Sequence, residues 1–343
     1  MKSFLTDLSI PQLSELVVQM DLPPYTASQL LLWIYQRRVD SFDDMSNLSK
    51  ETRLRLEERF TLDALTCVDV QTASDGTQKF LCELKDGAKI ECVLIPSEVR
   101  GSLTACLSSQ VGCGMACDFC RTGKMGLIRN LTLGEITSQL RLVMKKASAP
   151  VTNIVFMGMG EPLANWKVVA DVVDFMTHPQ GFKISKTKIT LSTSALLPQL
   201  REFCKRHDVK IAISLSATTN ELRDKLMPIN KKYPIEDIMQ FCREYAETSR
   251  HRITFEYVLI AGVNDQREDA ERLVKLLDGI LAKVNLIPMN PFEGCDYKRP
   301  SMETYQWWSD YLREHGITAP VRISGGRDIL AACGQLATAK LRR

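Results

Sequence analysis

The spacing of apolar residues along this chain changes near residue 100. In the first part, apolar positions recur every three to four residues, which is typical of amphipathic helices. Three segments show this spacing: residues 10–20, 26–38 and 49–60. Pro23-Pro24 interrupts the pattern between the first two segments, as expected of a helix-breaking residue. We therefore predict a small helical module over residues 1–62.

A β-hairpin is predicted next, in a connecting region over residues 63–100. Residues 79–84 and 89–95 alternate or are continuously apolar. The dipeptide Asp86-Gly87 between them favours a tight turn. This hairpin would join the helical module to the rest of the chain.

From residue 101 onward, β-rich runs alternate with helix-like segments. The predicted strands are residues 103–108, 153–159, 188–194, 210–216, 252–260 and 283–288. The predicted helices are residues 133–146, 166–176, 198–206, 235–246 and 267–277. Such alternation implies an α/β domain with a parallel sheet, residues 101–343. A doubly wound sheet and a curved, incomplete barrel both fit, and in either one the chemistry gathers beyond the carboxyl ends of the strands.

Cysteine is the unusual feature of an otherwise ordinary composition. Of 343 residues, 45% are hydrophobic and 25% charged, which excludes collagen-like and wholly disordered proteins. The eleven cysteines are an odd number spread along the chain, unlike a small disulfide scaffold. The sequence shows neither a secretory signal nor an apolar run near the roughly 20 residues that span a membrane. We therefore expect a cytoplasmic protein without membrane contact.

Charge is distributed unevenly between the two parts. Residues 1–100 hold 11 Lys and Arg against 16 Asp and Glu, whereas residues 101–343 hold 33 against 25. A basic catalytic region suits an anionic partner such as RNA, and a solvated surface of mixed charge would give the same imbalance. The candidate phosphate contacts are Arg121, Lys124, Arg129, Lys183, Lys186, Lys188, Lys231 and Lys232.

Three closely spaced cysteines follow the first predicted strand of the α/β domain. Cys113, Cys117 and Cys120 form a C-x3-C-x2-C pattern, in a loop where glycines and Ala116 permit close wrapping. A structural zinc site usually takes four ligands in pairs, and no histidine is near. Three thiolates can instead hold three irons of a [4Fe-4S] cluster and leave the fourth iron open. We predict cluster ligands, and a zinc-stabilised RNA-binding protein without catalysis is the rival interpretation.

Together with five further segments, this pattern resembles the RlmN/Cfr family of radical S-adenosylmethionine (radical SAM) RNA adenine methyltransferases. The segments are residues 156–163 (FMGMGEPL), 192–194 (STS), 227–233 (MPINKKY), 285–292 (NLIPMNPF) and 331–336 (AACGQL). The similarity extends from about Pro24 to Leu336 and is closer to the RlmN branch, which methylates C2 of an adenosine in 23S rRNA. The Cfr branch, which methylates C8, is the alternative. The resemblance implies an incomplete (β/α)6 radical SAM barrel with a helix-hairpin-helix-like N-terminal module.

The resemblance also implies a [4Fe-4S] cluster and a SAM site at the strand ends. The positions that match SAM contacts are Gly160, Glu161, Ser192, Ser214, Leu215, Ser216 and Asn290. Glycines permit close backbone approach and Glu161 could accept from an ammonium group. The segment lacks the P-loop pattern, and an ordinary strand-to-helix turn is the alternative. Ser216 and Met289 depart from the family, where His and Trp, respectively, are frequent.

Two further cysteines and one glutamate receive roles from the resemblance alone. Cys333 would take a methyl group from one SAM, and a second SAM would yield a 5′-deoxyadenosyl radical that removes hydrogen from this methyl group. The carbon radical would add to adenine C2, Glu91 would accept the C2 proton, and Cys106 would attack the Cys333 sulfur to leave a disulfide. Thiolate nucleophilicity suits both cysteines. The remaining cysteines are expected to be small buried residues: Cys67, Cys82, Cys92, Cys204, Cys242 and Cys295.

The partners implied by the resemblance are 23S rRNA, with tRNA as a further candidate, and an electron donor such as flavodoxin. A monomer is compatible with the sequence. The target adenine would have to be unstacked to reach a buried site, which favours looped RNA. A different radical SAM activity, such as sulfur insertion or glycyl-radical activation, is a third interpretation and would leave Cys333 unmodified.

Overall fold

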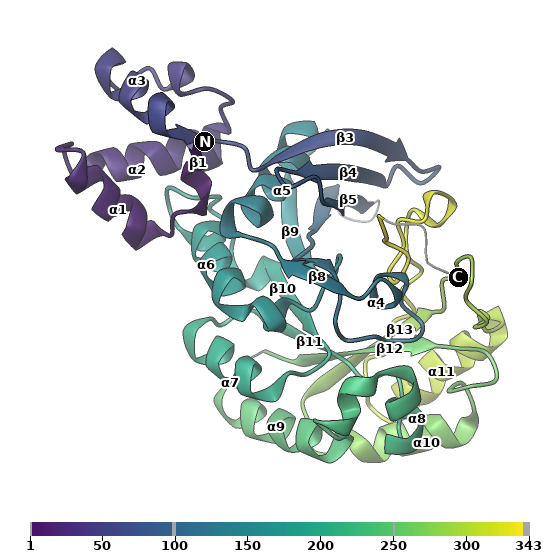
Figure 1. The fold of residues 1–343 in the computed structure, drawn as a ribbon. Coiled ribbons are helices and arrows are strands. Elements are labelled where there is room, and N and C mark those ends of the chain that lie inside the picture. The colour runs from purple at the N-terminus through teal and green to yellow at the C-terminus, as the bar shows by residue number, and fades with distance from the viewer. Residues whose placement is uncertain (1, 98–100, 250, 339–343) are drawn as a thin grey trace.

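A computed structural model describes residues 2–97, 101–249 and 251–338, and a mixed sheet lies at its centre (Figure 1). The described residues form a nine-stranded sheet of order β13-β12-β11-β10-β9-β6-β5-β4-β3. Strands β6 and β9 to β13 pair in parallel, and β5, β4 and β3 extend them in antiparallel fashion. The strands are β3 (Leu65–Thr72), β4 (Gln78–Leu84), β5 (Lys89–Ser97), β6 (Ser102–Cys106), β9 (Val151–Phe156), β10 (Ile189–Thr193), β11 (Lys210–Ser214), β12 (Ile253–Leu259) and β13 (Ala282–Pro288).

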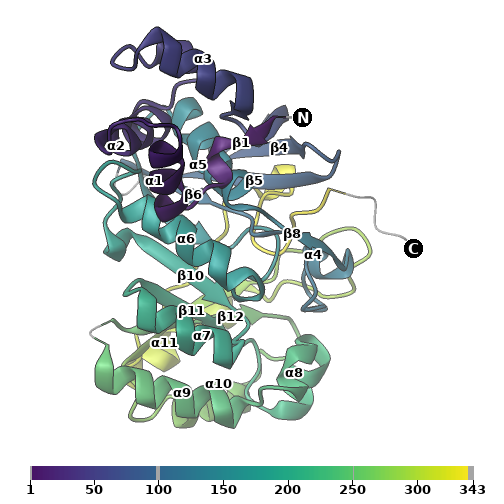
Figure 2. The ribbon, with the colours of Figure 1, turned by 60° about the vertical axis from the view of Figure 1, so that its left-hand side comes forward.

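The parallel strands follow chain order without a reversal. A doubly wound sheet reverses its order at a switch point, so that alternative is excluded. Figure 2 shows α6, α7, α9 and α10 along one side of the sheet. The helices of this domain include α5 (Leu133–Lys146), α6 (Trp166–Thr177), α7 (Leu197–Arg206), α9 (Ile235–Thr248), α10 (Arg267–Leu276) and α11 (Met302–Glu314). No helix in the described part of the chain is both long and apolar enough to cross a membrane.

The predicted strands and helices of the α/β domain are present, with ends shifted by a few residues. The hairpin prediction is also confirmed, because β4 and β5 pair antiparallel across Asp86-Gly87. The pattern missed β3, because most of this outermost strand is exposed and carries polar residues that hide its alternation. It also missed α8 (Asn220–Leu226) and α11. The predicted boundary at residue 100 lies outside the described residues. The same holds for residues 339–343, the end of the predicted α/β domain.

The N-terminal module contains the helices α1 (Ile10–Gln19), α2 (Tyr25–Leu31) and α3 (Lys50–Arg59). Ser9 and Ser49 cap α1 and α3 by accepting from backbone N–H groups, which satisfies donors that have no partner within the helix. The predicted helix over residues 26–38 is present, but its type changes in the second half. After Leu31 the chain forms a π-helical turn, Leu32–Arg37, and Arg38 ends it with a left-handed φ of 56°.

One buried arginine on α5 fastens this module to the α/β domain. Arg141 is 1% exposed. Its guanidinium donates to the carbonyl oxygens of Ile34 at 3.1 Å, Leu62 at 3.1 Å and Val39 at 2.7 Å, and it pairs with Asp63. Since a buried charge is stable only when its donors are satisfied, this residue makes the position of the module dependent on α5.

Arg141→Met should therefore destabilise the protein by roughly 3–5 kcal/mol, because it leaves several buried carbonyl groups and Asp63 without their donor. Urea denaturation measures this free energy of unfolding. Lys145→Met is the matched control. Lys145 is also on α5, and its substitution removes a more exposed salt bridge to Asp40. This loss should cost about 0–1 kcal/mol of stability. Equal losses in the two variants would contradict the role of Arg141.

Candidate active site

The carboxyl ends of the parallel strands meet at one pocket with an empty volume of about 1030 Å³. Most of the predicted site residues line it: Cys113, Cys117, Cys120, Gly160, Glu161, Ser192, Ser214, Ser216, Asn290 and Cys333. These side chains come from loops that are far apart in the sequence. The structure thus brings these residues together beyond the strand ends, where we expect the chemistry to gather.

Tight backbone contacts shape the loop that carries the three cysteines. The loop lies between β7 (Gln110–Gly112) and α4 (Arg121–Lys124), and β7 pairs with β8 (Leu127–Asn130). A Cβ atom on Gly112, where φ is +76°, would lie 1.9 Å from the Gly126 carbonyl oxygen. A Cβ atom on Gly123 would lie 2.8 Å from the Cys117 carbonyl oxygen. Glycine is therefore needed at both positions for the loop to close.

The three thiols lie in a protected environment near one another. Burial raises the pKa of Cys113 to about 12, and the proximity of Cys120 adds to this shift. Burial likewise raises the pKa values of Cys117 and Cys120. Without a bound cation the thiols stay protonated, because a metal or cluster is what makes such thiolates favourable.

The three cysteines of the loop face the pocket together. Among the described residues, no three His, Cys, Asp or Glu side chains converge on a point that could hold one metal ion. A four-iron cluster needs no such point, because each thiolate binds a different iron. Cys113, Cys117 and Cys120 instead line one wall of the pocket.

Glu161 is buried and fully hydrogen-bonded at the end of the β9 loop. Its Oε1 accepts from the Thr193 hydroxyl at 2.7 Å and from the Leu163 N–H at 3.0 Å. Its Oε2 accepts from the N–H and hydroxyl of Ser194 at 2.8 and 2.9 Å. Burial raises the pKa of this carboxyl group, and the hydrogen bonds oppose the shift. Thr193 and Ser194 belong to the STS segment of residues 192–194, and they orient this acidic group of the pocket.

A close contact explains why a glycine, Gly160, precedes Glu161. Gly160 has a φ of +102°, and a Cβ atom there would lie 2.6 Å from Cβ of Gln110. The Gln110 side chain in turn accepts from the Glu161 N–H at 2.8 Å. Gly160 thus lets the β9 loop approach β7 and so sets the position of Glu161.

Arg223 on α8 supports the serine-bearing strand ends, a role that the sequence pattern did not indicate. This buried side chain donates to the carbonyl oxygens of Ser194 at 3.2 Å, Ser214 at 3.0 Å and Leu215 at 3.2 Å. Leu215 is fully buried and does not line the pocket. Ser216, where φ is 50°, accepts from the Val258 N–H at 3.3 Å. Arg223 therefore ties the ends of β10 and β11 together.

Asn290 connects the pocket wall to the loop of Cys333. Its amide nitrogen donates to the Cys333 carbonyl oxygen at 3.2 Å and to the Ser324 hydroxyl at 3.1 Å. Its amide oxygen accepts from Arg299, which also donates to the Met289 carbonyl oxygen at 2.9 Å. The predicted SAM contact is therefore also a support for the cysteine loop.

Cys333 lines a second pocket as well, and Cys106 lines that pocket with it. The second pocket has an empty volume of about 850 Å³. Cys333 is solvent-accessible although protein surrounds its thiol, whereas Cys106 on β6 is 7% exposed. Burial raises the pKa of each thiol to about 12. Both cysteines are free thiols in this structure.

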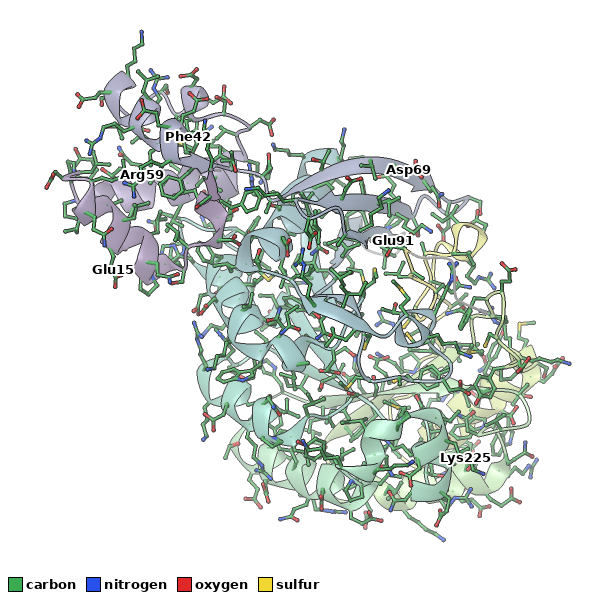
Figure 3. The ribbon with its side chains drawn as sticks, in the orientation of Figure 1. Glu15, Phe42, Arg59, Asp69, Glu91 and Lys225 are labelled. Atoms are coloured by element: carbon green, nitrogen blue, oxygen red, sulfur yellow. The ribbon has the colours of Figure 1, made fainter. Side chains whose placement is uncertain are left out.

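Glu91 on β5, which is labelled in Figure 3, lines neither pocket and has partners of its own. It is 5% exposed, its Oε1 lies 3.2 Å from Lys79 Nζ, and its Oε2 accepts from the Ala337 N–H at 2.9 Å. Burial raises the pKa of this carboxyl group, and Lys79 opposes the shift. Glu91 therefore holds the chain just after the Cys333 loop, and its role as proton acceptor stays a prediction.

Arg129, one of the candidate phosphate contacts, is engaged within the protein. Its guanidinium donates to both carboxylate oxygens of Glu135 at 2.8 Å and to Asp86 at 2.7 Å. These bonds join β8 to the start of α5 and to the hairpin turn. Arg129 is therefore a structural residue here.

The fold and the cysteine loop define a radical SAM enzyme. The family model of the radical SAM superfamily matches residues 107–277. A solved radical SAM methyltransferase from Sphaerobacter thermophilus superimposes with a TM-score of 0.93 at 42% identity, covering 97% of this chain and 99% of that one. The chain thus has the radical SAM α/β fold with a mixed sheet.

Two further comparisons identify the family. Residues 4–62 match the model of the ribosomal RNA large subunit methyltransferase N-terminal domain. The dual-specificity RNA methyltransferase RlmN of Syntrophotalea carbinolica is 46% identical over 332 residues, covering 97% of this chain and 89% of the relative. RlmN of Geobacter sulfurreducens is 46% identical over 329 residues, covering 96% and 90%. The chain belongs to the RlmN family and is a SAM-dependent methyltransferase, which sets aside the non-catalytic zinc protein.

Gly160→Ala should weaken SAM binding by roughly tenfold or more, about 1.4 kcal/mol, because the new Cβ atom displaces Gln110 and with it Glu161. Isothermal titration calorimetry of the cluster-loaded protein measures this affinity. Gly262→Ala is the matched control, since Gly262 also has a positive φ of 71° but has no neighbour within 4 Å of the added Cβ. It should cost about 1–2 kcal/mol of stability and leave SAM affinity unchanged. An unchanged affinity in Gly160→Ala would contradict the packing argument.

Proposed function

We propose that this chain methylates C2 of an adenosine in 23S rRNA, and an adenosine of tRNA as a second substrate, through a methyl group carried on Cys333. The observation that carries the proposal is that Cys333 lines both pockets. The cluster cysteines and Glu161 line the first pocket, and Cys106 lines the second. The naming of the 46% identical relatives as dual-specificity RNA methyltransferases supports RNA as the substrate class.

The proposal assigns a part of the reaction to each region of the chain. Residues 1–62 would contact RNA, residues 63–100 would form the connecting hairpin region, and residues 101–343 would form an incomplete (β/α)6 barrel. Cys113, Cys117 and Cys120 would hold a [4Fe-4S] cluster. When bound, the cluster supplies the electron that cleaves SAM to a 5′-deoxyadenosyl radical. Two SAM molecules would be used per turnover, and a donor such as flavodoxin would provide the electron.

Cys333 solves a chemical difficulty of the adenine C2 position. This carbon is electrophilic and its hydrogen is not acidic, so it does not attack the electrophilic methyl group of SAM directly. A thiolate does, since thiolates are strong nucleophiles. Cys333 would first become S-methylated by displacement, and the carbon that reaches adenine would then be bound to the protein through sulfur.

Cys106 would release the product. Its thiolate would attack the Cys333 sulfur, and the bond between that sulfur and the RNA-bound carbon would break. The electron pair of the broken bond would leave with the carbon, which would take up a proton to become the methyl group, and a disulfide would remain. The two thiols lining one pocket support this pairing. Because the disulfide must be reduced before each new cycle, we place the enzyme in the reducing cytoplasm.

Glu91 would accept the C2 proton only after a rearrangement. Both of its carboxylate oxygens have partners, Lys79 and the Ala337 N–H. The bond to Ala337 would have to break for Oε2 to reach a substrate. We therefore expect RNA binding to displace the chain that follows Cys333.

Cys106→Ala should accumulate a covalent complex between enzyme and RNA, because the nucleophile that releases the product is missing. A denaturing gel with labelled RNA detects the complex, and mass spectrometry of digested RNA locates the methyl group. Cys333→Ala should form neither complex nor product. Cys242→Ala, which removes a buried thiol on α9, is the control and should still give 2-methyladenosine. Methylated RNA from Cys333→Ala, or C8-methyladenosine as the only product, would contradict the proposal.

Anaerobically purified protein should contain roughly four irons and four sulfides per chain. Cys117→Ala should lose most of this iron, because one iron loses its protein ligand. Metal and sulfide analysis measures both. Stoichiometric zinc without iron would contradict a cluster at this loop.

A further inference from the structure

A buried carboxylate that the mechanism above does not use lies between the two pockets. Glu256 on β12 is 6% exposed and lines both of them. In the sheet register it lies between Ser214 of β11 and Asn285 of β13. Because paired residues of neighbouring strands point to the same face, the three side chains lie on the inner face of the sheet. Glu256 and Cys333 therefore line the same two pockets, and the charge of Glu256 acts on the Cys333 thiol.

Glu256 has one carboxylate oxygen free to accept a proton. Its Oε1 accepts from the Asn285 amide at 2.7 Å, and no described residue donates a hydrogen bond to Oε2. The amide oxygen of Asn285 is itself buried without a donor. Buried acceptors without donors are unfavourable by about 1–3 kcal/mol each. A proton delivered to this carboxyl group would supply the donor that the pair lacks.

The other two acidic residues of the site are not free in this way. All of the acceptor positions of Glu161 described above are filled by backbone N–H and hydroxyl groups. Glu91 pairs with Lys79 and with the Ala337 N–H, and it lines neither pocket. Among these three carboxylates, Glu256 alone lines a pocket with an oxygen that has no protein donor.

The groups that face Glu256 come from three directions. Asn285 and Lys283 belong to β13. Arg322, which comes after α11, lies beside that strand, where its N–H donates to the Leu286 carbonyl oxygen at 2.7 Å, and it lines the second pocket. Cys333 comes from the C-terminal loop. Burial raises the pKa of Glu256, whereas the Asn285 hydrogen bond and the cations Arg322 and Lys283 lower it. A carboxylate with a raised pKa is a stronger base than an ordinary one.

We propose that Glu256 accepts the proton that Cys333 loses when it takes a methyl group from SAM. This inference rests on the proposed function of Cys333 as the methyl carrier. The S–H bond of Cys333 breaks as an O–H bond forms on Glu256. The bond between the methyl carbon and the SAM sulfur breaks as the bond to the Cys333 sulfur forms, and its electron pair stays on the SAM sulfur. The step needs no oxidant or reductant.

The test follows methylation of Cys333 in the cluster-loaded protein with trideuteromethyl-SAM, without RNA and without a reductant. Glu256→Gln keeps the shape and an acceptor for Asn285 but removes the basic group. It should slow appearance of the labelled Cys333 peptide, read by mass spectrometry, on the order of 100-fold near neutral pH. The difference from the wild type should narrow as pH rises, because hydroxide then removes the proton. Glu256→Asp, which keeps a carboxylate at greater distance, should fall in between.

The direction in which Glu256→Gln changes the methylation rate of Cys333 shows whether Glu256 acts as a base or only as a negative charge. A neighbouring carboxylate that acts only through its charge raises the pKa of the Cys333 thiol, so its removal would speed methylation. Iodoacetamide labelling of Cys333 without SAM follows the same rule: Glu256→Gln should label more slowly if Glu256 is a base. Iron content and the midpoint of urea denaturation should equal those of the wild type, which shows that the variant folds and can hold its cluster.

The outcomes distinguish the two proposals. A wild-type protein whose Cys333 starts as an unmethylated thiol and still gains no label would overturn the proposed function. A wild-type protein that is labelled, together with a folded Glu256→Gln variant that is labelled at an equal or higher rate, would overturn only the role of Glu256. If Glu256→Gln does not fold, Glu256→Asp decides the question: a rate equal to the wild type at every pH would contradict the inference.

Discussion

The position of one thiol, Cys333, is the constraint on which the site depends, and hydrogen bonds to the backbone carbonyl oxygens of its loop fix it. Asn290 donates to the Cys333 carbonyl oxygen at 3.2 Å, the Arg121 N–H donates to the Gly334 carbonyl oxygen at 2.8 Å, and Thr122 donates to the Leu336 carbonyl oxygen at 2.7 Å. Arg121 and Thr122 directly follow Cys120, the last of the three proposed cluster ligands. The same contacts therefore set the distance between the proposed cluster and the proposed methyl carrier, which catalysis by proximity requires.

The antiparallel strands complete this support from the other side of the loop. Asp75, in the turn between β3 and β4, accepts from the Gly326 N–H at 2.9 Å, and Lys79 donates to the Ile329 carbonyl oxygen at 2.7 Å. Figures 1 and 2 show the C-terminal segment in yellow beside these strands. The region predicted as a connection between two modules therefore also holds one wall of the second pocket.

The sequence predicted what local patterns encode and missed what only the fold assembles. The C-x3-C-x2-C spacing and the glycines around it indicated a cluster loop, and the β/α alternation indicated the parallel strands. The roles of Cys106 and Cys333 came from the resemblance, because 227 positions separate them. Glu256 gave no signal, since a single acidic residue within an apolar strand resembles an ordinary surface position until its register with Asn285 is known. Arg223 was also missed, because the carbonyl groups to which it donates lie at the ends of two strands that only the fold brings together.

The central claim is that the methyl group passes through Cys333 and loses a hydrogen atom there before it reaches RNA. Isotope labelling tests it most directly: the protein, carrying an unlabelled reduced Cys333, is given trideuteromethyl-SAM, the electron donor and RNA, and the product nucleoside is weighed. The account predicts a methyl group with two deuterium atoms and one hydrogen atom, because one deuterium leaves with 5′-deoxyadenosine and a proton later replaces it. A product methyl group that retains all three deuterium atoms would mean direct transfer, and would contradict the account.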